Sequence, residues 1–303
     1  MEIEEEQKQK EINELDKKFK EADLKKQSEK NENEIKEKKQ KIKLPKNMKT
    51  INLIILGMAG SGKTTFVQKL EEELANKDKE SYIINLDPAV MDTLYEPNLD
   101  IKDTIKYKEV MTSNNLGPNG AILTCLNLFS TNIDKVLTIL ESKTDLDYIV
   151  MDTPGQLEVF SWSASGKIIT DSFSLIFPSI LIYIIDIPRC SNPNTFSSNM
   201  LYALSIMYKM KLPLLLAFNK VDIAKENKVI EWMQDYQILQ EVLSKKDDYM
   251  STFSSSLSLL LNEFYKTIKY VSVSSKTGEG FDELINKCEE IQKKYEEEVL
   301  ETQ

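Results

Sequence analysis

The feature that most constrains the fold is an apolar segment that runs directly into a glycine-rich loop. Residues 51–56 are nearly all aliphatic, and Gly57 begins the spacing G-x-x-x-x-G-K-T, which is typical of a phosphate-binding loop. Apolar residues then recur at helical spacing from Phe66 to Leu74. A buried strand, a loop and an amphipathic helix in this order predict a triphosphate site and argue against a chance glycine-rich turn.

The residue types in this loop suit the chemistry of phosphate binding. Glycines let backbone N–H groups approach phosphate oxygens, and the N-terminus of the following helix adds the positive end of its dipole. Lys63 would supply positive charge to the β- and γ-phosphates, and the Thr64 hydroxyl would ligate Mg²⁺. The predicted phosphate-binding residues are therefore Gly60, Ser61, Gly62, Lys63, Thr64 and Thr65.

The rest of the chain alternates apolar segments with helical patterns. Further strands are predicted at 82–86, 146–151, 179–185, 212–218 and 268–273, and helices at 99–111, 121–140 and 281–300, with mixed helical structure over 225–267. Strands that are apolar throughout indicate a mainly parallel sheet covered by helices on both faces. The expected fold class is therefore α/β, of the P-loop NTPase type, in which motifs at the carboxyl ends of the strands lie together.

Composition separates this domain, residues 49–303, from a charged N-terminal extension at residues 1–48. The extension consists almost entirely of Glu, Lys, Gln and Asn, which predicts a disordered or helical segment. Seven lysines against one acid lie between Lys36 and Lys49. A solvated lysine-rich tail is favoured there over a basic patch for nuclear import or RNA.

Charge and composition argue against several classes of function. The 303-residue chain has a net charge of −10, whereas a general nucleic-acid binder is usually basic. Its three cysteines are far apart, which argues against a disulfide framework or a zinc site. The acidic start shows no apolar leader, and no apolar window is long enough to span a bilayer. We therefore expect a cytoplasmic or nuclear protein with no direct nucleic-acid or membrane partner.

Two features of the composition limit the mechanism. The chain has no histidine, so any proton transfer must use a carboxylate, lysine, tyrosine, cysteine or water. Arg189 is its one arginine, so an arginine finger supplied by this chain has a single candidate.

A second motif, Asp152-x-x-Gly155, follows the predicted strand at 146–151. After a phosphate-binding loop, an acid at this position holds Mg²⁺, and a glycine lets a backbone N–H approach the γ-phosphate. Gln156 is a candidate for orienting a water molecule, since its side-chain amide both donates and accepts hydrogen bonds.

A third motif, Asn219-Lys220-x-Asp222, bears on the base. The Asp222 carboxylate can accept hydrogen bonds from N1–H and the 2-amino group of guanine, a donor pair that adenine lacks. Asn219 can bridge neighbouring loops, and the Lys220 stem can lie along the base plane. Together with Ser275 and Lys276 in a later Ser-Ser-Lys loop, the motif predicts GTP or GDP binding and argues against a simple strand-end turn.

Asp87, at the end of the predicted strand 82–86, has interpretations that these residues alone leave equally open. The carboxylate could ligate Mg²⁺ through water, or orient and deprotonate the attacking water. It could equally cap a helix, which the following Pro88 favours.

Taken together, these motifs resemble the GPN-loop GTPase family, part of a class of dimeric P-loop GTPases. The resemblance covers about residues 50–295 and rests on GMAGSGKTTF, NLDPAV, LGPNGAI, DTPGQLEVF and NKVD. Gly117-Pro118-Asn119, which taken alone predicts only a loop, corresponds to the insertion that names the family. LGPNGAILTCLNLFST, EVFSWSASGKIIT and the Trp232-Met233 segment most resemble the first of three eukaryotic paralogues.

The resemblance implies a homodimer, or a heterodimer with a related GPN-loop GTPase. Each Gly117-Pro118-Asn119 loop would reach into the partner's nucleotide site, where Asn119 would stabilise the transferring phosphoryl group. The resemblance also places Asp87 in the first switch, and it assigns Asp87 and Gln156 to catalysis alongside Lys63 and Asn119.

The expected function is a GTP-hydrolysing switch that uses GTP, GDP and Mg²⁺, with the metal held by Thr64 and Asp152. Family resemblance further implies assembly and nuclear import of RNA polymerase II, with polymerase subunits and chaperones as partners. Relatives commonly carry a long acidic tail with export signals, which is not found before Gln303, so a cytoplasmic location is expected and shuttling to the nucleus stays open. The rival functions are a P-loop ATPase of the same class acting in cargo targeting, which NLDPAV suits but Asp222 opposes, and a non-hydrolysing GTP-bound scaffold.

Overall fold

The computed structural model describes residues 47, 49–244, 264–265 and 267–300. Its centre is a seven-stranded sheet in the order β3-β2-β4-β1-β5-β6-β7, and every strand pair in it is parallel. The strands are β1 (Ile51–Gly57), β2 (Ser81–Asn85), β3 (Leu99–Asp100), β4 (Tyr148–Asp152), β5 (Ser179–Asp186), β6 (Leu214–Asn219) and β7 (Lys269–Val273). The predicted α/β parallel fold is confirmed, while the predicted extension at residues 1–48 lies, apart from residue 47, outside the described residues.

Helices cover both faces of this sheet because successive side chains of a strand point in opposite directions. Leu53 and Ile55 of β1 pack in one apolar cluster with α2 (Lys63–Asn76) and α14 (Phe281–Leu300). Ile54 and Leu56 pack in a second cluster on the other face. The helices of that second cluster include α5 (Pro118–Ser130), α6 (Ile133–Glu141), α8 (Ala164–Ser174) and α10 (Pro193–Met210).

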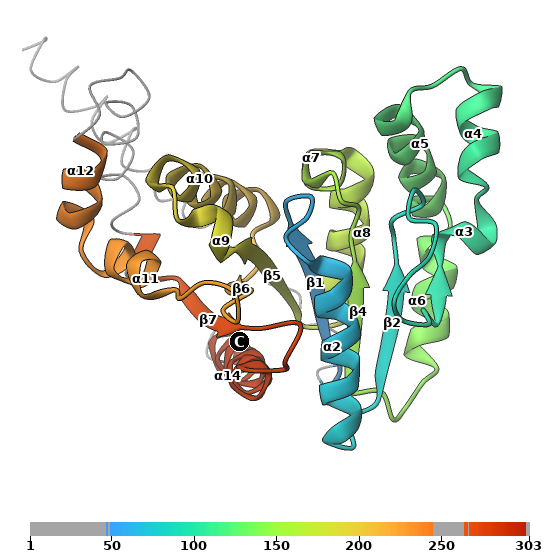
Figure 1. The fold of residues 1–303 in the computed structure, drawn as a ribbon. Coiled ribbons are helices and arrows are strands. Elements are labelled where there is room, and N and C mark those ends of the chain that lie inside the picture. The colour runs from blue at the N-terminus through green and yellow to red at the C-terminus, as the bar shows by residue number, and fades with distance from the viewer. Residues whose placement is uncertain (1–46, 48, 245–263, 266, 301–303) are drawn as a thin grey trace, which may run out of the picture. The chain divides into compact units, whose positions relative to one another are not determined.

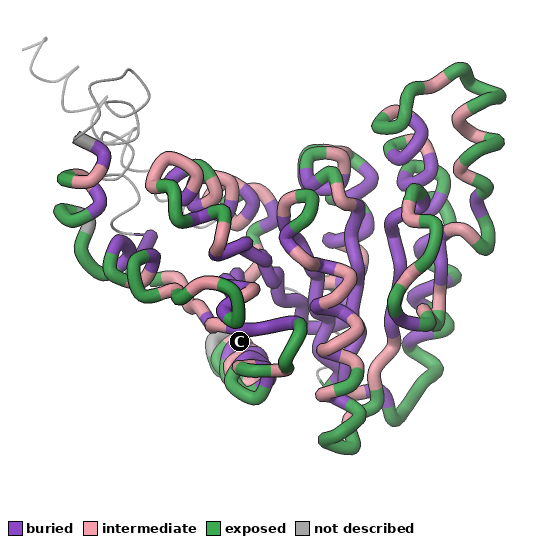
Figure 2. The backbone as a smooth tube through the Cα atoms, in the orientation of Figure 1, coloured by how far each residue is buried: buried purple, intermediate pink, exposed green. Residues whose placement is uncertain are grey.

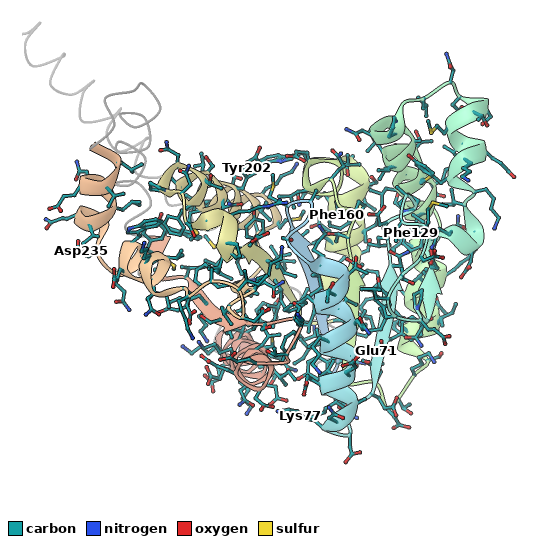
Figure 3. All side chains as sticks on the ribbon, viewed as in Figure 1. Glu71, Lys77, Phe129, Phe160, Tyr202 and Asp235 are labelled. Carbon is teal, nitrogen blue, oxygen red and sulfur yellow. The ribbon has the colours of Figure 1, made fainter. Side chains whose placement is uncertain are left out.

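The figures show how this layering buries the central strands. In Figure 1, α2 stands in front of β1, and α14 lies by β7. Figure 2 shows the strands buried along most of their length, with exposure confined mainly to helix surfaces and turns. Phe129 of α5 and Phe160, both labelled in Figure 3, belong to the larger cluster. The sheet is therefore a platform, buried at its central strands, whose ends carry the loops.

The predicted helix over 99–111 is wrong in its first part. Leu99 and Asp100 form the short strand β3, which pairs with Ile84 and Asn85 of β2. The Asp100 side chain then accepts a hydrogen bond from the backbone N–H of Lys102 and caps α3 (Ile101–Thr104). Extended backbone at residues 105–106 separates α3 from α4 (Tyr107–Ser113).

The predicted helix over 121–140 is two helices, and the first begins earlier than expected. Pro118 stands at the first position of α5, where its missing N–H costs nothing, and Gly117 is the N-cap. The last three residues of the predicted loop at 114–120 are thus the start of a helix. The chain breaks again at residues 131–132, where the Asn132 N–H bonds to the Phe129 carbonyl before α6 begins.

Four helices fall where no helix was assigned from sequence. They are α7 (Leu157–Ser161), α8, α9 (Ile187–Cys190) and α10. Three of them carry side-chain caps: Ser163 accepts from the Gly166 N–H before α8, Asp186 from the Arg189 N–H before α9, and Asn192 from the Asn194 N–H before α10. In the predicted mixed region, the described part holds α11 (Asn227–Gln234) and α12 (Tyr236–Ser244), and residues 245–263 lie outside it.

The turn between β7 and α14 depends on Gly280. Its φ is +82°, and a Cβ there would lie 2.0 Å from the Ser272 carbonyl oxygen. Gly117 is the opposite case, since its φ is −71° and a Cβ added there would meet no atom of the described residues within 4 Å.

Gly280→Ala should therefore lower the free energy of unfolding by roughly 2 to 3 kcal/mol, because it adds both strain and a backbone clash. Gly117→Ala is the matched control and should change it by less than about 0.5 kcal/mol. Urea unfolding followed by circular dichroism measures both. Equal effects of the two substitutions would contradict this account of the turn.

Candidate functional site

The predicted motifs converge at the carboxyl edge of the sheet, with the glycine-rich loop at the end of β1. The loop closes through a hydrogen bond from the Ser61 N–H to the Met58 carbonyl, 3.1 Å, and α2 begins at once. Gly62 has φ +96°, and a Cβ there would lie 2.7 Å from the Asn219 amide nitrogen. Only glycine fits at this position, because the loop that begins at Asn219, which is expected to bind the base, packs directly on the phosphate loop.

Lys63 lies inside this loop with no carboxylate in contact among the described residues. Its Nζ donates to the carbonyl oxygens of Gly57 at 2.8 Å and Met58 at 3.4 Å, and the residue is 7% exposed. Burial lowers the pKa of the Lys63 ammonium, and the charges of Asp152 and Asp87 oppose that shift. The buried Ser61 hydroxyl finds no partner in the described part of the chain. An ammonium with no carboxylate in contact and a hydroxyl with no hydrogen-bond partner, both beside backbone N–H groups, fit an anionic ligand.

Asp152 ends β4 and is 3% exposed. Burial raises the pKa of its carboxyl to about 6, although hydrogen bonds from Tyr95 and Thr64 and the charge of Lys63 act to lower it. Its Oδ2 accepts a hydrogen bond of 2.8 Å from the Tyr95 hydroxyl. No sequence motif predicted this contact. The structure thus brings Thr64 and Asp152 together, as predicted.

This pair of residues fits Mg²⁺ better than a metal that needs a protein cage. The described residues hold no group of three or more acidic or cysteine side chains able to hold a metal ion. Mg²⁺ typically keeps several waters and takes one or two protein ligands plus phosphate oxygens. Thr64 and Asp152 are the residues that would hold it here.

Asp87 links the loop after β2 to the loop after β4. Its Oδ2 accepts from the Gly155 N–H at 3.0 Å, and its Oδ1 accepts from the Ala89 N–H at 3.0 Å. No helix follows Asp87 in this described segment, so the helix-cap interpretation is wrong. Gln156, next to Gly155, is exposed at the start of α7. The two residues proposed to place water therefore flank the same backbone N–H.

The predicted bridging by Asn219 is present. Its amide nitrogen donates to the Ser61 carbonyl at 3.0 Å, and its Oδ1 accepts from the N–H and hydroxyl of Ser275 at 3.1 and 2.9 Å. Asp222 is exposed, and its Oδ1 accepts a 2.7 Å hydrogen bond from the Ser274 hydroxyl. Lys276 is exposed in the same loop. The phosphate loop and both base loops are thus joined through one buried amide.

Asp186 belongs to this site but was not predicted for it, and Arg189 was considered only as the candidate for an arginine finger. The Lys220 ammonium contacts Asp186 Oδ2 at 2.6 Å and the Gly60 carbonyl at 2.9 Å. The Arg189 guanidinium donates to the Ala59 carbonyl at 3.0 Å and lies 3.5 Å from Asp186. Asp186 ends the apolar strand β5, so its position at a strand's carboxyl end was the available signal. The chain's one arginine therefore lies on its own phosphate loop.

The Gly117-Pro118-Asn119 loop lies elsewhere in the molecule. It forms the start of α5, and Asn119 is exposed. Figure 1 shows the turn between α4 and α5 at one end of the molecule, well apart from the loop between β1 and α2. In the described chain, this predicted catalytic residue is not brought to its own phosphate site.

Comparison with known proteins identifies the family to which this chain belongs. A family model described as "Conserved hypothetical ATP binding protein" matches residues 55–294. GPN-loop GTPase 1 from Dictyostelium discoideum is 55% identical over 238 residues, which cover 78% of this chain and 60% of that protein. GPN-loop GTPase 1 from Saccharomyces cerevisiae is 49% identical over 266 residues, covering 83% of this chain and 69% of that protein. The chain belongs to the GPN-loop GTPase family.

A solved structure supports the same conclusion. The crystal structure of a GTPase in apo form from Pyrococcus abyssi matches with a TM-score of 0.70 and 26% identity, covering 80% of this chain and 97% of that one. The resemblance seen in the motifs is therefore confirmed. The chain spans about 60% of the length of the Dictyostelium relative. None of the helices in the described residues is long and apolar enough to cross a membrane.

The position of Asp222 generates a test of base recognition. Asp222→Asn should weaken GTP binding about 10- to 100-fold, because a charged acceptor is lost, and should improve binding of xanthosine triphosphate, because the amide can donate. Equilibrium titration with fluorescent nucleotides measures both affinities.

The control is Asp134→Asn, which removes the same charge from an exposed position on α6. It should leave both affinities unchanged. An unaltered GTP preference in Asp222→Asn would refute the assigned role.

Proposed function

We propose that this chain is a GTP-hydrolysing conformational switch. The observation that carries the proposal is the joining of the phosphate loop to the Asp222 loop through Asn219. A triphosphate held beside Lys63 would then place its base near a carboxylate acceptor, which suits guanine and not adenine. The GPN-loop GTPase relatives support the same nucleotide, although the family model's description names ATP.

Hydrolysis would proceed by in-line attack of water on the γ-phosphate. Lys63 and the N–H groups of the phosphate loop would stabilise charge on the transferring group. When bound at Thr64 and Asp152, Mg²⁺ would neutralise charge on the β- and γ-phosphate oxygens. We assign the orientation of the attacking water and the acceptance of its proton to the side chains of Asp87 and Gln156.

The Asp87–Gly155 hydrogen bond suggests how the switch works. The Asp87 carboxylate accepts a hydrogen bond from the Gly155 N–H, the group that would donate to a γ-phosphate oxygen when GTP is bound. A bound γ-phosphate would accept the hydrogen bond from that N–H in place of Asp87. Asp87 Oδ2 would then be free to accept a hydrogen bond from the attacking water. Loss of phosphate would let the bond form again, so the segments after β2 and β4 would move together.

A dimer would complete the site with Asn119 from a second chain. Asn119 is exposed, and its loop lies apart from its own phosphate loop. Gly117 has neither a positive φ nor a neighbour that would exclude a side chain, so packing within the chain does not explain this glycine. Close approach of another molecule would explain it. The dimer is a homodimer or a heterodimer with a related GPN-loop GTPase.

We extend the proposal to assembly and nuclear import of RNA polymerase II, with polymerase subunits and chaperones as partners and a cytoplasmic location with shuttling to the nucleus. This extension rests on family resemblance. Co-purification from cells with polymerase subunits, reduced by Lys63→Ala, tests it.

Single-turnover hydrolysis of GTP and of ATP, measured side by side with Mg²⁺, separates the rival functions. The proposal expects GTP to be cleaved at least about 100-fold faster, because adenine leaves the Asp222 acceptor unpaired. Faster ATP cleavage would favour an ATPase, and no cleavage of either would favour a GTP-bound scaffold.

Asn119→Ala should slow GTP hydrolysis about 100-fold, the usual cost of one lost donor to a transition state, with GTP affinity near that of the wild type. Asn127→Ala is the control, since Asn127 is also exposed on α5 but lies beyond the loop. Sedimentation with GDP plus a phosphate mimic, compared with GDP alone, should show the dimer. An unaffected rate in Asn119→Ala would leave the loop with a structural role only.

A further inference from the structure

Tyr95 is the inward-facing residue of the segment that joins β2 to β3. Of residues 91–98, Tyr95 alone is buried, at 5% exposure, whereas its neighbours Met91 and Leu94 are 80% and 59% exposed. An aromatic ring turned inward from an otherwise exposed segment needs a reason in what it contacts.

The contact is with the carboxylate expected at the metal. The Tyr95 hydroxyl donates to Asp152 Oδ2 at 2.8 Å, and Asp152 is itself 3% exposed. Thr64, the second residue expected at Mg²⁺, hydrogen-bonds to the same carboxylate. A buried tyrosine hydroxyl normally forms a hydrogen bond, and here its acceptor is an oxygen of a residue expected to bind the metal.

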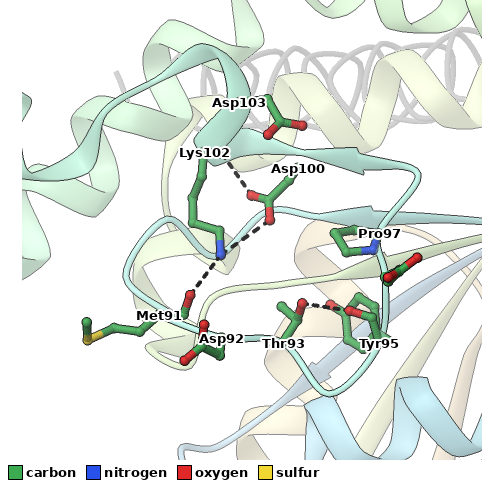
Figure 4. Close-up of a pocket in the computed structure, with 9 residues that line it drawn as sticks. Met91, Asp92, Thr93, Tyr95, Pro97, Asp100, Lys102 and Asp103 are labelled. Atoms are coloured by element: carbon green, nitrogen blue, oxygen red, sulfur yellow. Dashed lines mark hydrogen bonds and ion pairs between the residues drawn. The ribbon is translucent and has the colours of Figure 1, made fainter.

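The rest of the segment is fixed by its own short-range contacts (Figure 4). The Thr93 hydroxyl donates to the Tyr95 carbonyl at 2.7 Å, and the Lys102 ammonium donates to the Met91 carbonyl at 3.3 Å and lies 3.4 Å from Asp100. A pocket of about 470 Å³ is lined by Tyr95, Asp100 and Lys102 together with other residues of the segment. Tyr95 is therefore the side chain through which the segment reaches the end of β4.

We propose that Tyr95 is a positioning residue for the magnesium site. Its O–H holds one oxygen of the Asp152 carboxylate and so leaves the other oxygen for the metal, and it ties the segment 91–98 to metal occupancy. The inference rests on the proposed function, because it presumes a nucleotide–Mg²⁺ complex at this site. A ring without the hydroxyl would fill the same space but would leave the carboxylate free to rotate.

Tyr95→Phe in the full chain tests the proposal through Mg²⁺ affinity instead of turnover. Dissociation of fluorescent GDP is followed at increasing Mg²⁺ concentration. The concentration that gives half-maximal slowing should rise about 10-fold, the usual scale for losing an outer partner of a metal ligand, while the rate in EDTA stays within about 2-fold. Hydrogen exchange of residues 91–98 should slow on adding Mg²⁺ and GDP in the wild type and not in the variant.

Tyr148→Phe is the matched control. Tyr148 is also buried, and its hydroxyl also donates to a carboxylate, that of Glu289 at 3.2 Å, but at the amino end of β4. Its Mg²⁺ dependence should equal that of the wild type. Normal GDP binding with unchanged Mg²⁺ dependence in Tyr95→Phe would overturn this inference alone. Failure of the wild-type chain to bind GDP would overturn the proposed function and the inference with it.

Discussion

The site depends on one buried amide, that of Asn219. Three of its hydrogen bonds join the phosphate loop after β1 to the loops after β6 and β7. The close approach of that amide also leaves no room for a side chain at Gly62. Unmade hydrogen bonds of a buried amide are costly, so all three loops are constrained together. Phosphate and base recognition are therefore parts of one rigid arrangement, set by strands of the β1-β5-β6-β7 part of the sheet.

Around this fixed part, the groups expected to contact phosphate and metal are buried, and burial disfavours their charged forms. Burial lowers the pKa of Lys63 and raises that of Asp152 to about 6, which means that each favours its neutral form more than it would in water. A bound triphosphate would supply negative charge beside Lys63, and a bound cation would supply positive charge beside Asp152. Ligand binding would thus relieve a cost that folding imposes.

Sequence patterns predicted the platform well because its central strands are mainly apolar and most of them end in recognisable motifs. They were weaker where structure depends on short elements: β3 has two residues, and α7 and α9 have five and four. Pro118 could have indicated the early start of α5, since proline favours a first helical position. Tyr95 carries no such signal, because its role comes from a contact across 57 positions of the chain. Asp186 offered only its position at the end of a strand, since its ion pair with Lys220 spans 34 positions.

The parallel sheet also makes the two ends of the molecule chemically unequal. The polar groups of the site gather at the carboxyl ends of the strands, whereas α2 ends at the opposite side, where Lys77 is labelled in Figure 3. Asn76, in the last turn of α2, is exposed there, and the three native cysteines are all buried. A thiol introduced at Asn76 would accordingly give a single accessible handle for a fluorophore or a surface tether, remote from the nucleotide and its switching loops.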